Sequence, residues 1–134
     1  MKFNRLIPEL DVSNLKRSER FYVGKLGFKR EYARKGFVFL SFQGSQLMLE
    51  EGTGYGTGPL RRPYGRGVNF HIEVDAIAPL VRRLRQKKVP SNVAPYDAWY
   101  SKGDVLLGCR EFLVQDPDGY LLRFSQDIGV KRMS

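Results

Sequence analysis

Residues 6–28 have the sequence LIPELDVSNLKRSERFYVGKLGF. Apolar and polar residues alternate from Leu6 to Val12, which is typical of a half-buried strand. Ser13 and Asn14 then provide a helix N-cap, and apolar residues recur at helical spacing until Gly27, a residue suited to end a helix. This stretch therefore predicts a strand that is followed at once by a helix.

The rest of the chain extends this unit and then repeats it. Three extended segments, 29–33, 37–42 and 46–50, follow the first helix and are separated by turn residues. The second copy is predicted to contain a strand at Val68–Val74, an N-cap at Asp75, a helix with Pro79 in its first turn, extended segments near 93–96, 105–107, 110–115 and 121–126, and an Asp116–Gly119 turn.

The order βαβββ thus occurs twice, which predicts an α+β fold in which each half is too small to bury a core alone. We expect one domain over residues 1–134, with modules at 1–51 and 68–134. Residues 52–67 are rich in Gly and Pro and are expected to form a flexible linker, without the sequence pattern of a phosphate-binding loop.

Two motifs in this arrangement resemble those of the vicinal-oxygen-chelate superfamily, which contains glyoxalases, extradiol dioxygenases and bleomycin-resistance proteins. The first is the capped helix at 13–18 with Phe21-Tyr22 and Leu26-Gly27-Phe28 behind it, and the second is Asp116-Pro117-Asp118-Gly119 before the last strand. The bleomycin-resistance branch is the most similar, because of Arg110-Glu111-Phe112 and Leu121-Leu122-Arg123. The resemblance implies two modules that form a partial barrel with a concave cleft, a homodimer, and a small-molecule ligand held without turnover.

The resemblance also gives the positions at which superfamily enzymes hold a divalent metal. They correspond to Ile7, Asn69 and Arg123, with Glu50 near the fourth. An aliphatic group cannot bind a metal, a guanidinium has no acceptor, and an amide is a poor ligand for soft metals, so we expect no metal cofactor and no catalytic residues. His71, the only histidine, lies two residues beyond the expected histidine position and is interpreted as a hydrogen-bonding cleft residue rather than a ligand or general base.

Strand alternation predicts which side chains line the cleft. Three glutamates on the inward faces would make part of it acidic and suited to a cationic ligand such as bleomycin, and aromatic rings would stack on a flat ligand. Of Phe37 and Phe39, we expect only one in the cleft and the other in the core. The predicted ligand-binding residues are Glu9, Phe37, Phe39, Met48, Glu50, Asn69, His71, Glu73, Trp99, Tyr100 and Arg123.

One departure from the bleomycin-resistance pattern concerns a stacking residue. Some bleomycin binders carry a Trp two residues before the Arg-Glu-Phe triplet, where this chain has Gly108. Trp99, in a segment 96–103 interpreted as a polar loop, is the candidate to replace it.

Composition restricts the remaining possibilities. With one cysteine, Cys109, the chain can form neither an intrachain disulfide nor a cysteine-based zinc site. There is no signal-peptide pattern or membrane-spanning run, so a cytoplasmic location is expected. The net charge of +9 favours nucleic acid, but Lys and Arg residues cluster on the polar faces of two amphipathic helices and are interpreted as solvated surface.

Three functions follow from these observations. The first is a ligand-sequestering protein of the bleomycin-resistance type. The second is a metal-dependent lyase, dioxygenase or thiol transferase of the same superfamily, with a metal held by His71 and Glu50. The third is nucleic-acid binding through Arg61, Arg62, Arg66 and the basic helices.

Overall fold

A computed structural model describes residues 1–54 and 57–133, and it divides the chain into two compact units. Unit 1 comprises Met1–Gly67 and Asp116–Tyr120, and unit 2 comprises Val68–Gln115 and Leu121–Ser134. Part of the predicted linker, residues 55–56, lies outside the described residues. Within the described residues, the structure has no helix that is long and apolar enough to cross a membrane.

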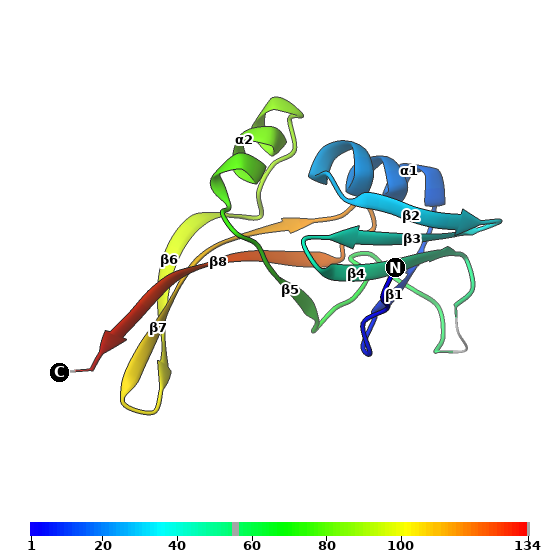
Figure 1. Cartoon of the computed structure of the whole chain (residues 1–134). Helices are drawn as coiled ribbons and strands as arrows, with labels where there is room; N and C mark the ends of the chain where they lie inside the picture. The colour runs from blue at the N-terminus through cyan, green and yellow to red at the C-terminus, as the bar shows by residue number, and fades with distance from the viewer. Residues whose placement is uncertain (55–56, 134) are drawn as a thin grey trace. The chain divides into compact units, whose positions relative to one another are not determined.

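Unit 1 contains one four-stranded sheet in the order β1-β4-β3-β2 (Figure 1). The β1 strand pairs with β4 in parallel, and the other two pairs are antiparallel. Its elements are β1 (Glu9–Val12), α1 (Leu15–Glu19), η1 (Arg20–Leu26), β2 (Lys29–Arg34), β3 (Phe37–Phe42) and β4 (Ser45–Glu51).

The helix of unit 1 begins and ends where the sequence predicts. The Asn14 side chain accepts a hydrogen bond from the Arg17 backbone N–H at 3.0 Å, and Gly27 ends the helix with a left-handed φ of 93°. The second half of the helix, η1, has the wider turns of a π-helix. Apolar residues of α1–η1 and of one sheet face form a core that includes Tyr22, Leu40 and Leu49, which are fully buried.

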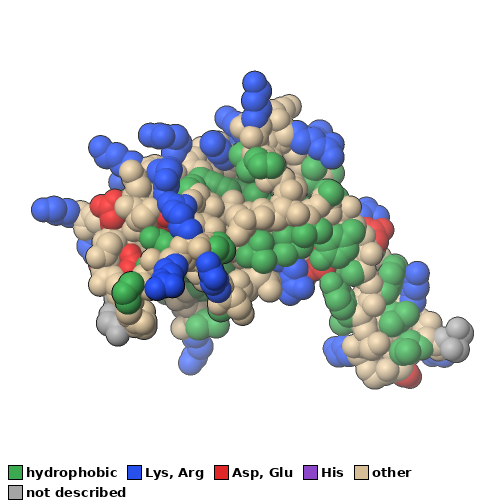
Figure 2. Space-filling model, turned by 180° about the vertical axis from the view of Figure 1, so that it is seen from behind, with side chains coloured by type: hydrophobic (Ala, Val, Ile, Leu, Met, Phe, Trp, Pro, Cys, Tyr) green, Lys and Arg blue, Asp and Glu red, His purple; other side chains and the backbone are tan. Residues whose placement is uncertain are grey.

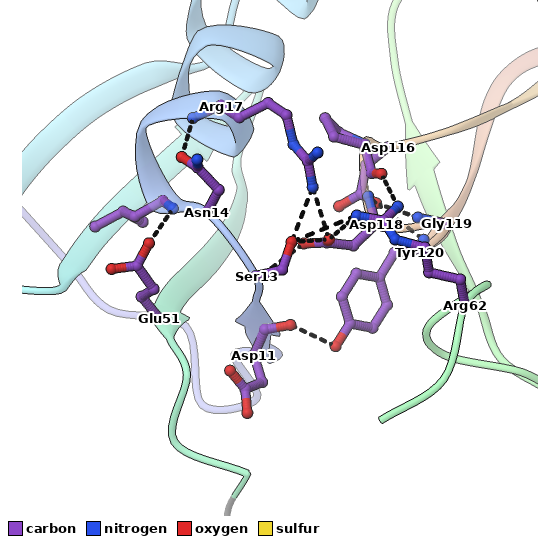
Figure 3. Close-up of polar contacts among 12 residues, drawn as sticks. Asp11, Ser13, Asn14, Arg17, Glu51, Arg62, Asp116, Asp118, Gly119 and Tyr120 are labelled. Carbon is purple, nitrogen blue, oxygen red and sulfur yellow. Dashed lines mark hydrogen bonds and ion pairs between the residues drawn. The ribbon is translucent and has the colours of Figure 1, made fainter. Parts of the chain in front are cut away.

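The Asp116–Tyr120 turn belongs to unit 1 and contacts the start of α1 (Figure 3). Asp118 is fully buried and accepts hydrogen bonds from the Ser13 backbone N–H at 3.0 Å and hydroxyl at 2.5 Å. The guanidinium groups of Arg17 and Arg62 lie 3.0 and 3.1 Å from the same carboxylate. Both motifs that carry the family resemblance therefore meet at one ion-pair cluster around the buried Asp118.

Unit 2 repeats the sheet topology, with the order β5-β8-β7-β6 and a parallel β5–β8 pair. Ile72, Leu122, Phe112 and Phe124 are buried on the face above which α2 lies (Figure 1). The elements are β5 (Asn69–Glu73), α2 (Ala78–Gln86), β6 (Val93–Lys102), β7 (Val105–Gln115) and β8 (Leu121–Arg132).

Three predictions for unit 2 are wrong in detail. Asp75 does not cap α2: the N-cap is Ile77, whose backbone N–H donates to Gln126 Oε1 at 3.0 Å. Segment 96–103 is not a loop, because β6 continues to Lys102 by pairing with β7. The last strand runs to Arg132 rather than 126. Together β6, β7 and β8 extend past the end of β5 as a long ribbon (Figure 1).

Most basic side chains of the two helices lie on solvent-exposed faces, as predicted, but Arg17 is half-buried and pairs with Asp118. Lys16, Arg20, Arg82, Arg83 and Arg85 are exposed, whereas Leu80 and Leu84 of α2 are buried. Figure 2 shows Lys and Arg side chains spread over the visible face rather than gathered in one continuous patch.

Candidate functional site

The site residues of unit 1 form two rows across the sheet, on the face opposite α1. One row runs through Glu9, Met48, Phe39 and Tyr32, which are paired in register from β1 to β2. The next row runs through Asp11, Glu50, Phe37 and Arg34. The predicted residues Glu9, Phe37, Phe39, Met48 and Glu50 are thus on one face of one sheet.

Phe37 and Phe39 share this face, so the prediction that only one of them can face the cleft is wrong. Residues two apart in a strand point the same way. Both rings are nevertheless buried: the Arg34 guanidinium lies 3.7 Å from the Phe37 ring centroid, and Tyr32 stacks on Phe39 with the ring centroids 5.2 Å apart. Phe3 covers Phe39 edge-on at 5.3 Å.

Tyr32 is a partly exposed aromatic ring on this face, and sequence reasoning missed it. Its exposed fraction is 37%, whereas that of Phe39 is 1%. A β-bulge between Arg30 and Tyr32 brings Tyr32 opposite Phe39. Simple alternation along β2 would have placed Tyr32 on the α1 side, so only the bulge brings it to the site.

The site residues of unit 2 also form rows, on the sheet face opposite α2. One row runs through His71, Arg123 and Leu113, and the next runs through Glu73, Ser125 and Glu111. Tyr96 of β6 is the next residue in the Glu111 row. Asn69, His71, Glu73, Tyr100 and Arg123, all predicted, therefore share this face, and Glu111 is a buried member that was not predicted.

Glu111 is the centre of this polar face. It is fully buried, and its Oε1 atom accepts hydrogen bonds from the Tyr100 hydroxyl at 2.5 Å and the Tyr96 hydroxyl at 3.1 Å. The Arg123 Nε atom lies 3.8 Å from Glu111 Oε2. Burial raises the pKa of Glu111, but the two hydroxyls and the Arg123 charge outweigh burial and hold the pKa below its usual value.

Arg123 also contacts the single histidine. Its Nη2 atom lies 3.2 Å from His71 Nδ1, and its side chain is 29% exposed. The hydrogen bond to Glu111 raises the pKa of Tyr100 to about 12, so this hydroxyl stays protonated at neutral pH. The unit 2 face is therefore a fully formed polar network that ends in a partly exposed guanidinium–imidazole pair.

Trp99 lies on the other face of unit 2, in register with Gly108. A Cβ atom at Gly108 would be 2.6 Å from Trp99 Cζ3, so the indole ring occupies the space that a side chain at 108 would fill. Lys131 Nζ lies 3.8 Å from the ring centroid. The structure does not place Trp99 beside His71 and Arg123, and it is separated from Tyr100 by strand alternation.

The metal positions implied by the family do not fit a metal. Ile7, an aliphatic residue, precedes β1. Arg123 places a positive charge where the family has a metal-binding side chain, and its guanidinium lies against His71 Nδ1, the nitrogen that would otherwise be open to a metal. Among the described residues, no group of three or more His, Cys, Asp or Glu side chains is placed to hold an ion. A cavity of about 310 Å³ is lined by residues 89–92 and Gln115, none of which is a predicted site residue.

Comparisons with known proteins agree with this topology. A bleomycin resistance protein from Geobacillus stearothermophilus is 29% identical over 133 residues, which cover 91% of this chain and 96% of the relative. A glyoxalase/bleomycin resistance protein/dioxygenase structure from Alicyclobacillus acidocaldarius has a TM-score of 0.71 at 19% identity, and the match covers 94% of this chain and 92% of that chain. A bleomycin-binding protein complexed with bleomycin has a TM-score of 0.64 at 20% identity, and the match covers 92% of this chain and 98% of that chain.

The two solved structures show the fold alone at these identities, and that fold is an α+β arrangement of two open, mixed four-stranded sheets. The model of the Glyoxalase/Bleomycin resistance protein/Dioxygenase superfamily matches residues 7–124, which include both βαβββ repeats as far as the start of β8. The chain therefore belongs to the glyoxalase/bleomycin resistance protein/dioxygenase superfamily.

Proposed function

We propose that this protein sequesters an aromatic, cationic small molecule, bleomycin or a drug like it, and holds it as a homodimer without chemical change. The observation that carries the proposal is the Glu9 row of unit 1, defined by Glu9, Met48, Phe39 and Tyr32. It combines an exposed carboxylate at one end with an exposed aromatic ring at the other.

The dimensions of this row suit an elongated ligand. Three strand spacings separate Glu9 from Tyr32, which is roughly 14 Å at about 4.8 Å per strand. A flat ring can pack on the exposed part of Tyr32, which stacks on the neighbouring Phe39, and a cationic group can contact Glu9. The net charge of +9 does not oppose this, because fields beyond about 10 Å are screened at 0.1 M salt.

The bleomycin resistance relatives support the same ligand class, although 29% identity does not transfer a ligand by itself. Arg123, which contacts His71 Nδ1 and places a positive charge at a ligand position of superfamily enzymes, supports binding over metal-assisted turnover. On unit 2, the proposed contacts are Asn69, His71, Glu73, Tyr100 and Arg123.

Calorimetric titration with bleomycin tests the proposal. We expect saturable binding at one or two sites per dimer, a dimer in sedimentation analysis, and recovery of the drug with unchanged mass. Tyr32→Leu and Glu9→Gln should each weaken binding about tenfold, which corresponds to about 1.4 kcal/mol. Asp104→Asn, which removes an exposed charge from the turn between β6 and β7, is the matched control and should bind like the wild type.

The outcomes separate the parts of the proposal. No saturable heat with the wild-type protein contradicts the ligand class, a monomer contradicts the dimer, and a modified drug contradicts sequestration. Because Trp99 is the only tryptophan, protein fluorescence during the titration tests whether it takes part in binding. A change in fluorescence supports its predicted place in the site, and an unchanged spectrum means that it does not contact the ligand.

A further inference from the structure

The guanidinium of Arg123 bridges two groups that would otherwise have no common partner. Its Nη2 atom contacts His71 Nδ1 at 3.2 Å, and its Nε atom faces Glu111 Oε2 at 3.8 Å. His71 and Arg123 are direct neighbours in the β5–β8 ladder, whereas Glu111 comes from β7. Three strands therefore hold this cation at one place on the sheet.

The contact determines which nitrogen of His71 carries the proton. A guanidinium has donors and no acceptor, so the Nδ1 atom must accept the hydrogen bond. An accepting Nδ1 is unprotonated, which leaves the proton on Nε2. Because His71 is exposed on this face, its Nε2–H group is a donor available to a ligand.

Glu111, at the buried end of this network, keeps Arg123 in position without accepting a hydrogen bond from its guanidinium. Glu111 Oε2 and Arg123 Nε are both buried and have no hydrogen-bond partner among the described residues, so an ion pair alone joins them. The Tyr96 and Tyr100 hydroxyls bind the other oxygen of Glu111 and stabilise part of its charge. The outer part of the guanidinium, which is partly exposed, remains able to donate.

We propose that Arg123 and His71, with the Asn69 amide on the same face, form a subsite for an acceptor oxygen of the ligand, a carbonyl or a carboxylate. The resident guanidinium provides at this place the positive charge that a metal ion provides in superfamily enzymes. The inference rests on the proposed function only for the statement that this face binds a ligand.

The first measurement needs no ligand. His71 is the only histidine, so long-range proton–nitrogen correlation spectra of ¹⁵N-labelled protein report its tautomer directly. We expect the Nε2–H tautomer alone in the wild type and a mixture of tautomers in Arg123→Met. Arg110→Met is the matched control, because Arg110 pairs with Asp97 across the β6–β7 pair and does not contact His71.

The second measurement uses acetate and N-methylacetamide as probes, at constant ionic strength. We expect a saturable shift of the His71 ring signals with at least one probe, and at least a tenfold weaker response in Arg123→Met. Response to acetate alone identifies a carboxylate subsite, and response to the amide alone identifies a carbonyl subsite.

Three results would overturn the inference: a wild-type His71 with mixed tautomers or the proton on Nδ1, no saturable shift with either probe, or equal responses in Arg123→Met and the wild type. The two wild-type results remain decisive if Arg123→Met does not fold. Bleomycin binding with mixed tautomers would reject the subsite and keep the proposed function. A probe response without bleomycin binding would keep the subsite and reject the proposed function.

Discussion

The two units share a strand order and a ladder register, but equivalent positions carry different chemistry. Glu9 of unit 1 lies four residues before Ser13, and His71 of unit 2 lies four residues before Asp75, the residues at which the sequence pattern places the two helix N-caps. The neighbour of Glu9 in β4 is Met48, and the neighbour of His71 in β8 is Arg123. The same backbone therefore presents a carboxylate and a thioether in one unit and an imidazole and a guanidinium in the other.

The next row makes the contrast sharper. Phe37 and Glu111 occupy equivalent positions, and both are almost completely buried. Arg34 covers Phe37 from the neighbouring strand, whereas Tyr96 donates a hydrogen bond to Glu111 from the corresponding strand. A buried carboxylate is stable at this position only because its neighbours supply hydroxyl and guanidinium donors. The two sheets thus show that the position in the fold determines whether a side chain is buried. The side chains on the adjacent strand determine whether that buried side chain can be polar.

The largest expected effect comes from placing glutamine at the two equivalent positions, 37 and 111. Phe37→Gln removes a buried ring and leaves an amide without matched partners, so we expect a loss of about 4 kcal/mol in the free energy of unfolding. Glu111→Gln keeps an oxygen that can accept from Tyr96 and Tyr100, so we expect a loss of only about 1–2 kcal/mol. Urea unfolding at pH 7 measures both.

Phe37→Leu is the control for loss of the ring alone and should cost about 1–2 kcal/mol. Equal costs for the two glutamine variants would mean that the surroundings of positions 37 and 111 do not differ as described.

Buried carboxyl groups in the two units should also respond to pH in opposite directions. Burial raises the pKa of Asp116 in unit 1 to about 6 from 3.8, despite hydrogen bonds from Tyr22 and the turn backbone. A raised folded-state pKa means that the native state binds the proton more tightly. Its stabilising contribution is therefore complete below about pH 4 and is lost as the pH rises through 6. For Glu111, whose folded-state pKa is lowered, stability is present above the ordinary value of 4.5 and is lost as the pH falls through the folded value.

Asp116→Asn and Glu111→Gln separate these contributions. Relative to Asp116→Asn, the wild type should gain about 2–3 kcal/mol of unfolding free energy between pH 7 and pH 4. Relative to Glu111→Gln, it should lose stability below about pH 4.5. Unfolding curves across this range check both slopes, and parallel curves for a variant and the wild type would show that the substituted carboxyl does not titrate as described.

Sequence patterns predicted the elements of both units because strand alternation, the Asn14 cap and Gly27 act locally. They also predicted which residues share a face wherever the strands are regular, as for His71 and Arg123. They failed at Tyr32, where a bulge changes the face, because a bulge depends on the partner strand.

The prediction also missed the burial of Glu111. Glutamate is rarely buried without partners, and Tyr96 and Tyr100 come from a strand whose second half has the polar composition of a loop. The register of β6 on β7, which brings those hydroxyls to Glu111, is not visible in either segment alone.

The smallest expected effect concerns Gly108, a glycine of unit 2 that packs against an indole ring. A Cβ atom at Gly108 would lie 2.6 Å from Trp99 Cζ3 and 2.9 Å from Ile128 Cγ1, so Gly108→Ala must displace the indole. Because Trp99 lies at the sheet surface under Lys131, the ring can tilt, and we expect a loss of only about 1 kcal/mol, with a shift in its fluorescence. In unit 1, Gly24→Ala is the matched control: its Cβ would be 3.8 Å from Arg20 Cγ, an ordinary contact, so fluorescence should not change. An unshifted Trp99 spectrum in Gly108→Ala would show that the indole does not fill the space above Gly108.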